Sequence, residues 1–208
     1  MSINKLYTLL QGEVVGLSGA VSFTLAKIDT YIEDKSIVGN VIQDWLGSFM
    51  KNKSISYDLP SNSQKFPDFL LDNQKSLLEV KCFTNSPNFD IANFHAYCRS
   101  LAKYPYRINS DYLIFKYSLD GYKIKIENVW LKKVWEICGG SQRSPIKLQW
   151  KQNQIYNIRP ITWYSENTIY PPFASKIDFI NAIEIVLNMS SIGGEWRKDW
   201  KKNLLENI

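Results

Sequence analysis

The chain has 208 residues, of which 45% are hydrophobic and 14% aromatic. This length is enough for one domain with a full core, and this composition excludes a disordered protein. The formal net charge of +5 is uneven: residues 1–98 carry 8 Lys/Arg and 10 Asp/Glu, a net of −2, whereas residues 99–208 carry 17 and 10, a net of +7. A polyanion-binding surface and an ordinary solvated basic surface both fit this distribution.

The sequence contains a single histidine, His95, and three cysteines that form no CxxC pair, namely Cys82, Cys98 and Cys138. The single histidine argues against zinc sites and histidine-metal nucleases, and a Ser-His-Asp triad could use only His95. His95 is instead expected on a helix surface or in the core. Three unpaired thiols suit a reducing compartment, so we expect a cytoplasmic protein. The uncharged stretch 14–26 lacks the cleavage site of an export signal, and no segment has the length and apolar character of a membrane span.

The first strong element expected along the chain is a helix at residues 34–51. Its apolar residues recur every four positions in two adjacent columns, which is the pattern of one broad helical face. The columns are Ile37, Val41, Trp45 and Phe49, and Val38, Ile42 and Leu46. The helix should therefore pack on a core, and a polar connection at residues 51–60 should follow it.

Two apolar runs separated by a short polar stretch predict a β-hairpin at residues 66–83. The first run contains Pro67-Asp68, and the second contains Glu79-Val80-Lys81. Because strand side chains alternate between faces, Glu79 and Lys81 share one face. The other face carries Leu78, Val80 and Cys82. A buried strand has little reason to place a carboxylate and an ammonium side by side, so this face is a candidate site.

Helices and strands alternate along the rest of the chain. Helices are expected at 90–103, at 129–138, at 176–189 and, as a final basic helix, after Gly193-Gly194; strands are expected at 112–117 and 122–126, joined by a turn at 119–121. Residues 141–164 are polar and strand-like. The order of helix, hairpin, helix, hairpin and helix predicts an α/β or α+β fold, with a mixed central sheet flanked by helices in a single domain over residues 1–208.

Asp68, Glu79 and Lys81 are the candidate catalytic residues. Mg²⁺ prefers hard oxygen ligands and commonly binds one or two carboxylates, so Asp68, Glu79 and the backbone carbonyl of Val80 are its candidate ligands. A bound Mg²⁺ neutralises phosphate charge and acidifies a water. Lys81 could orient or deprotonate that water, or stabilise developing charge. The pattern therefore predicts phosphodiester hydrolysis, and the alternative is a surface strand on which Glu79 and Lys81 form a solvated ion pair.

In identity, order and spacing, Pro67, Asp68, Glu79 and Lys81 resemble the motif of the PD-(D/E)xK nuclease superfamily, whose fold is that of most Type II restriction endonucleases. The expected helices before and after the hairpin also match that fold, over a catalytic core of about residues 34–120. The resemblance implies a restriction-endonuclease-like fold with Mg²⁺ as cofactor. It also implies that a homodimer cleaves double-stranded DNA and leaves 5′-phosphate and 3′-hydroxyl ends.

Members of this superfamily often add a third acid from the helix that precedes the hairpin, and here the chain departs from the pattern. The helix expected at 34–51 offers no glutamate on the required face. Asp44 is the best carboxylate candidate for a third metal ligand, and Gln43 is a weaker candidate. An ordinary exposed helix face is the plainer interpretation of both residues.

Residues 141–165 form a candidate DNA-recognition region, because they are rich in the side chains that read base edges in the major groove. A hairpin or loop in this region could enter the groove. Ordinary exposed strands have a similar composition. The candidate DNA-binding residues are Gln142, Arg143, Lys147, Lys151, Asn153 and Arg159.

The sequence as a whole predicts a Mg²⁺-dependent, sequence-specific endonuclease of the restriction type that acts on double-stranded DNA. Two alternatives stay open at this point. One is a repair or junction nuclease of the same superfamily that cuts by DNA structure, and the other is a non-catalytic DNA-binding relative. Discrete bands from a digested plasmid would favour sequence specificity, whereas no cleavage with Mg²⁺ or Mn²⁺ would favour the non-catalytic relative.

Overall fold

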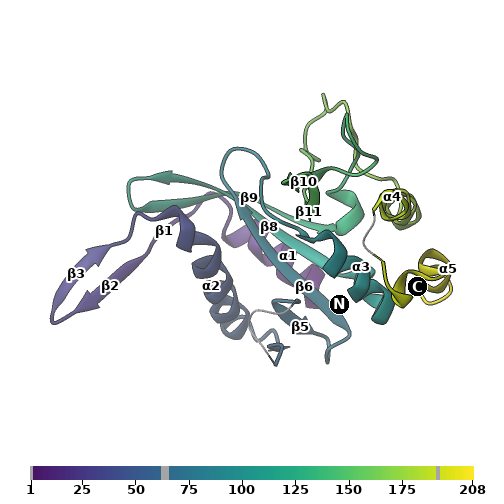
Figure 1. Ribbon diagram of the computed structural model, residues 1–208. Coiled ribbons are helices and arrows are strands. Elements are labelled where there is room, and N and C mark those ends of the chain that lie inside the picture. The colour runs from purple at the N-terminus through teal and green to yellow at the C-terminus, as the bar shows by residue number, and fades with distance from the viewer. Residues whose placement is uncertain (1, 62–65, 191–192) are drawn as a thin grey trace. The chain divides into compact units, whose positions relative to one another are not determined.

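The computed structural model describes residues 2–61, 66–190 and 193–208 (Figure 1). The chain divides into two compact units. Unit 1 comprises residues 1–86 and 111–131, and unit 2 comprises residues 87–110 and 132–208. The hairpin with the candidate catalytic residues belongs to unit 1, and the candidate DNA-recognition region belongs to unit 2.

Unit 1 is built on a six-stranded mixed sheet with the strand order β1-β9-β8-β6-β5-β4. Its strands are β1 (Ser18–Ala20), β4 (Tyr57–Asp58), β5 (Phe69–Leu71), β6 (Ser76–Phe83), β8 (Asp111–Asp120) and β9 (Lys123–Lys133). The central strand β6 pairs in parallel with β8 and antiparallel with β5. Two helices, α1 (Ser2–Glu13) and α2 (Val38–Asn52), share one hydrophobic core with these strands (Figure 1). The predicted mixed sheet flanked by helices is confirmed.

Helix α2 confirms the helix expected at residues 34–51. Asp34 caps a 3-10 turn, η1 (Lys35–Ile37), by accepting a hydrogen bond from the Ser36 backbone N–H at 2.8 Å, and α2 follows directly. Its buried row is Val38, Ile42, Leu46 and Met50. The other predicted column is less covered, since Trp45 is 39% exposed. Both columns are apolar, so the periodicity predicted the helix but could not decide which column the sheet covers.

The hairpin predicted at residues 66–83 is also confirmed. Strands β5 and β6 pair with Phe69 opposite Leu78 and Leu71 opposite Ser76. The connecting turn contains three residues with positive φ, Asp72, Asn73 and Gln74. Leu71 and Leu78 are fully buried, so the apolar face of the hairpin lies in the core, as the alternation of side chains requires.

The chain before residue 34 forms a helix and strands that were not predicted. Helix α1 buries Ile3, Leu6 and Leu10, which recur at helical spacing and would have signalled it. Strands β2 (Ser22–Leu25) and β3 (Ile28–Tyr31) form a separate antiparallel hairpin with Ala26 and Lys27 in its turn. Figure 1 shows this hairpin extending away from the six-stranded sheet of unit 1.

The helix predicted at residues 129–138 is wrong. Strand β9 continues to Lys133, and only Val134–Glu136 form a 3-10 turn, η3. Apolar residues at helical spacing are also found in a strand when the sheet supplies a partner, and β8 is a strand of ten residues beside β9. Pairing along the sheet therefore overrides the local pattern.

Unit 2 combines helices with a three-stranded sheet of order β10-β11-β7. The strands are β7 (Ala92–Asn93), β10 (Leu148–Lys151) and β11 (Gln154–Ile158); the helices are α3 (Phe94–Lys103), α4 (Lys176–Met189) and α5 (Trp200–Leu205), with 3-10 turns η2 (Pro105–Asn109) and η4 (Glu195–Arg197). Asn93 and Ser175 cap α3 and α4 through side-chain hydrogen bonds. The buried Trp200 indole N–H donates to the Cys98 carbonyl at 2.9 Å, which fixes α5 on α3.

The cysteines are free thiols, and Cys98 and Cys138 are buried as expected. Cys82 is half-buried on β6, and burial raises the pKa of its thiol to about 12. Within the described ranges, none of the helices combines the length and the apolar character that crossing a membrane would need.

Candidate active site

Asp68 lies immediately before β5, at the point where the β5–β6 ladder ends. Its Oδ2 accepts a hydrogen bond from the Val80 backbone N–H at 2.7 Å. The N–H and C=O of one strand residue point to the same side of the strand, so the Val80 carbonyl also points toward the end of β5. The register that pairs Phe69 with Leu78 continues to place Asp68 opposite Glu79. The hairpin thus brings Asp68, Glu79 and the Val80 carbonyl together.

Glu79 and Lys81, two residues apart on the same face of β6, form an ion pair that is largely buried from solvent. The Lys81 Nζ donates to Glu79 Oε1 at 2.9 Å, and the two side chains are only 21% and 11% exposed. The second carboxylate oxygen, Glu79 Oε2, is buried without a hydrogen-bond partner among the described residues. A solvated surface pair would not be buried in this way. The geometry therefore favours a functional pair over the plain surface strand.

The electrostatics of the site leave its negative charge only partly compensated. Burial raises the pKa of the Glu79 carboxyl, opposed by the charge of Lys81. Burial also raises the pKa of Asp68, opposed by the hydrogen bond from Val80, the charge of Lys81 and a hydrogen bond from Gln43. Burial alone would lower the pKa of Lys81, but the charge and hydrogen bond of Glu79 raise it above its ordinary value. One buried and one half-buried carboxylate beside a single ammonium would attract a further cation.

A cavity of about 320 Å³ opens beside these residues within unit 1. Its lining includes Asp68, Val80 and Lys81 from the hairpin, together with Asn40 and Gln43 from α2. Asn40 and Gln43 are three residues apart, so they share one face of the helix. The sequence places Asn40 beside the apolar stripe of this helix together with Gln43 and Asp44, and Asn40 lines the cavity with Gln43.

The third metal ligand suggested by the sequence is not at this cavity. Asp44 is exposed on α2, and the neighbouring Gln43 instead lines the cavity and bonds to Asp68. Within the described part of the chain, no group of three or more His, Cys, Asp or Glu side chains is placed to hold a metal. The donors that the hairpin brings together are two carboxylates and one backbone carbonyl, which suits a hard cation that keeps water ligands.

Comparison with known proteins shows the family of the chain. The family model of the NgoBV restriction endonuclease matches residues 1–208. The chain belongs to this family. The Type II restriction enzyme NlaIV of Neisseria lactamica is 37% identical over 201 residues, which cover 93% of this chain and 83% of that enzyme. The Type II restriction enzyme NgoBV of Neisseria gonorrhoeae is 35% identical over 130 residues, or 60% of this chain and 74% of that enzyme.

A solved structure of the NlaIV restriction endonuclease superposes with a TM-score of 0.89 at 34% identity, covering 99% of this chain and 87% of that one. The restriction-endonuclease-like fold and the enzyme class, a Type II site-specific deoxyribonuclease, are thereby confirmed.

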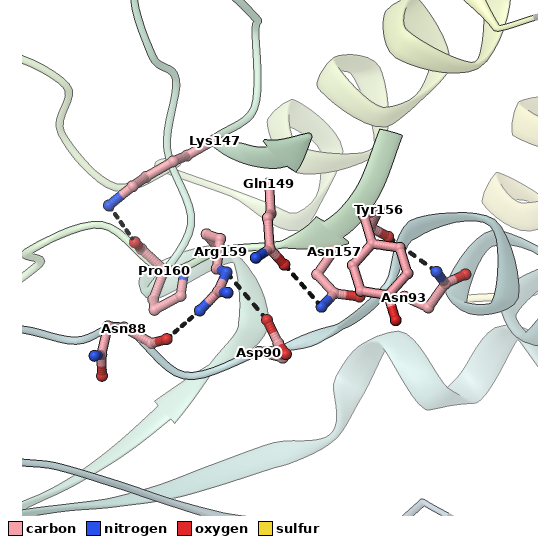
Figure 2. Close-up of polar contacts among 9 residues, drawn as sticks. All are labelled: Asn88, Asp90, Asn93, Lys147, Gln149, Tyr156, Asn157, Arg159 and Pro160. Carbon is pink, nitrogen blue, oxygen red and sulfur yellow. Dashed lines mark hydrogen bonds and ion pairs between the residues drawn. The ribbon is translucent and has the colours of Figure 1, made fainter. Parts of the chain in front are cut away.

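Two of the candidate DNA-binding residues of this member of the NgoBV restriction endonuclease family, Lys147 and Arg159, use their charged groups in contacts within unit 2 (Figure 2). The Lys147 Nζ donates to the Pro160 carbonyl at 2.9 Å, and Arg159 forms an ion pair with Asp90 at 3.0 Å while donating to the Asn88 carbonyl. Figure 2 also shows the Asn157 amide donating to Gln149 on the neighbouring strand. The contacts of Lys147 and Asn157 join the two sides of the β10–β11 hairpin, and those of Arg159 hold the hairpin against residues 88–90, just before β7.

The other four candidates, Gln142, Arg143, Lys151 and Asn153, are exposed. Arg143 and Asn153 line a second cavity, of about 310 Å³ within unit 2, together with Trp150 and His95. Asn153 stands in the β10–β11 turn with positive φ. The Lys151 Nζ lies 3.8 Å from the centroid of the Tyr156 ring. The position of Trp150 at this cavity was not predicted, because a single aromatic residue in a polar strand forms no distinctive sequence pattern.

His95 is buried on α3, as predicted for a core or helix residue. Burial lowers the pKa of its imidazole, and the nearby charges of Arg99 and Arg197 lower it further. Its Nδ1 is buried without a partner among the described residues. His95 is therefore a core residue of unit 2.

Proposed function

We propose that this restriction enzyme is a Mg²⁺-dependent endonuclease that cuts double-stranded DNA at a specific sequence, as a homodimer, leaving 5′-phosphate and 3′-hydroxyl ends. The observation that carries the proposal is the buried Glu79 Oε2, which has no partner among the described residues and lies on the strand that also holds the Lys81 ammonium. A buried carboxylate oxygen is costly unless it is compensated. A metal ion is the compensation that suits this donor set.

Asp68, Glu79 and the Val80 carbonyl would hold the Mg²⁺, and the fit rests on the hard oxygen donors that the hairpin already places together. When bound, Mg²⁺ supplies charge neutralisation at the phosphate and a more acidic water. The chain's own residues do the positioning. The Val80 N–H and Gln43 orient Asp68, and Glu79 fixes the Lys81 ammonium at 2.9 Å. Lys81 would thereby present a positive charge to the phosphate oxygen on which negative charge grows during attack.

We further propose that the whole of residues 1–208 works as one nuclease, with the catalytic core at about residues 34–120 and DNA recognition at about 141–165. The exposed Lys151 and Asn153 support this role for the β10–β11 hairpin, and Arg143, which precedes the hairpin, is also exposed. Gln142 lies just before it and is exposed as well. A reducing cytoplasm is the proposed compartment, because all three cysteines are free thiols.

Plasmid digestion tests the proposal. With Mg²⁺, the purified protein should convert a plasmid to a fixed set of bands, and excess EDTA should stop cleavage because carboxylates and a carbonyl cannot replace the metal. A smear or selective cutting of branched DNA would instead favour the structure-directed nuclease. Undiminished cleavage in EDTA, or none with either Mg²⁺ or Mn²⁺, would rule the proposal out.

Replacing Arg143 with alanine should weaken DNA binding by about tenfold and reduce the salt dependence of binding by about one unit of slope if its contact is to phosphate. Loss of discrimination between cognate and altered sites would instead assign it to a base edge. Fluorescence anisotropy with the cleavage-deficient Glu79→Gln protein measures both. Lys123→Ala, an exposed cation on β9 in unit 1, is the matched control and should leave affinity unchanged. An Arg143→Ala protein with unaltered affinity at every salt concentration would remove Arg143 from the interface.

A further inference from the structure

The hairpin formed by β2 and β3, here called the arm, has one polar and one apolar face. Cross-strand partners share a face, and the pairs Phe23–Thr30 and Leu25–Ile28 therefore place three large apolar side chains together. The opposite face carries Ser22, Thr24 and Asp29, with Tyr31 stacked on Tyr122 at a centroid distance of 4.1 Å. This division into two faces is the pattern of a hairpin that is covered on one side.

Among the residues that the structure describes, none covers the apolar face of the arm. Phe23, Leu25 and Ile28 are 54%, 66% and 71% exposed. An isolated two-stranded hairpin is at best marginally stable in water, and a cluster of exposed apolar side chains on a surface usually marks a binding site. The arm therefore has the properties of an element that is completed by a partner.

An apolar groove of about 380 Å³ lies in unit 1 at the base of the same arm. Val14, Leu17 and Val21 line one side of it, and Trp45 and Phe49 of α2 line the other. These aromatic residues are the part of the predicted helical face that the sheet does not cover. Because Leu25 and Ile28 stay exposed, the arm does not occupy the groove of its own chain.

We propose that the apolar face of the arm docks into this groove of a second copy of the chain, and that the two copies exchange arms reciprocally. The inference rests on the proposed homodimer and assigns its interface. Each copy has one arm and one groove. A two-fold symmetric dimer can therefore bury both arms in both grooves, and no further subunit is needed.

Charge and area both favour a second copy as the occupant. Residues 17–32 contain one lysine and one aspartate, Lys27 and Asp29, so the arm is neutral and gains nothing from a polyanion such as DNA. The three apolar side chains expose roughly 300 Å² on each arm, and two arm–groove contacts would bury roughly 1,200 Å² in total, which reaches the lower range of specific protein interfaces.

The oligomeric state of the full-length protein tests the interface without DNA or metal. Sedimentation velocity should find a dimer for the unaltered protein. The arm variant Leu25→Asp with Ile28→Asp, and the groove variant Trp45→Asp, should each raise the dimer dissociation constant at least about 100-fold, because each places charges in a desolvated contact. Leu17→Asp is a second groove variant at a position that is 61% exposed, in case Trp45→Asp impairs folding. Leu59→Asp, 64% exposed in unit 1 outside the arm and groove, is the control and should leave the dimer intact.

Mixing the two variants separates arm exchange from any other use of the same surfaces. A mixed dimer has one contact in which both halves are altered and one in which both are intact, whereas neither variant alone can form an intact contact. The mixture should therefore associate more tightly than either variant by itself. A monomeric unaltered protein, an arm variant with unchanged dimerisation, or a mixture no tighter than its components would each overturn the proposal. These results do not depend on cleavage, so a failure of the interface and a failure of the nuclease site would be told apart.

Discussion

Replacing Glu79 with glutamine should lower Mg²⁺-dependent DNA cleavage by at least about 1000-fold. Glutamine keeps the size of the side chain but removes the charge that would bind the metal and that holds Lys81 at 2.9 Å. Initial rates on a plasmid that the unaltered enzyme cuts give the measurement. DNA affinity in the absence of metal should change little, because the substitution removes no cation.

The matched control is Glu127→Gln on β9. Glu127 is paired with Lys116 at 3.3 Å in the same sheet, but both side chains are about one third exposed. Its substitution should leave the rate within about twofold, because exposed pairs contribute little. A Glu79→Gln enzyme that cuts at the rate of the Glu127→Gln enzyme would show that Glu79 is not part of the chemistry.

The Glu79→Gln variant should also be more stable than the unaltered protein at neutral pH when no divalent metal is present. Burial raises the pKa of Glu79 in the folded state above its ordinary value of 4.5. The folded protein then binds a proton more readily than the unfolded chain, so ionisation of Glu79 lowers the free energy of unfolding as the pH rises above 4.5. Thermal denaturation should give a higher Tm for the variant at pH 7, and the difference should vanish below pH 4.5. A lower Tm at pH 7 would mean that the Lys81 pair outweighs the burial of the carboxylate.

Replacing Lys81 with glutamine should lower kcat by about 100-fold to 1000-fold, with a much smaller change in KM, because a charge that stabilises the transition state contributes little to substrate binding. Lys81→Arg should retain more of the activity, since it keeps the positive charge. Steady-state cleavage of a short duplex separates the two parameters.

Lys35→Gln is the contrasting variant for Lys81. Lys35 lines the same cavity but is exposed, so its loss should weaken binding in a salt-dependent manner and leave kcat nearly unchanged. If Lys81→Gln affected only KM, Lys81 would be a binding residue and the proposed role in catalysis would be wrong.

The sequence pattern was sufficient to predict an element wherever its apolar residues recur with the period of a helix or a strand and lie on a buried face. The hairpin of β5 and β6 could be predicted because Leu78 and Val80 alternate with Glu79 and Lys81 along β6. Helix α4 followed in the same way from its apolar residues. The helix expected at 129–138 was wrong because pairing with the preceding strand β8 extends β9 to Lys133, and the local apolar pattern does not show this pairing.

The other contacts of the site join residues that the folded structure brings close together, and the spacing of residues along the sequence does not predict these contacts. Whether Gln43 or Asp44 approaches Asp68 is decided by the rotation of α2 on the sheet, and the two apolar columns of that helix permit more than one rotation. The internal partners of Lys147 and Arg159 lie on segments that only folding brings near, at Pro160 and Asp90. The basic residues that suggested DNA contacts therefore include two, Lys147 and Arg159, that form contacts within the folded chain.

The assignment of Glu79 and of the β10–β11 hairpin to different compact units bears on how specificity can diverge. Side chains at the β10–β11 turn are exposed and carry little of the packing of unit 2, so substitutions there cost little stability. Glu79 and Lys81 are on a central strand paired on both sides, where most substitutions would disturb the core. Under the proposed recognition role of this region, target specificity could change through the turn while the cleavage chemistry is kept. Libraries randomised at Lys151 and Asn153, and at Arg143 before the hairpin, would be the starting material for directed evolution of new specificities.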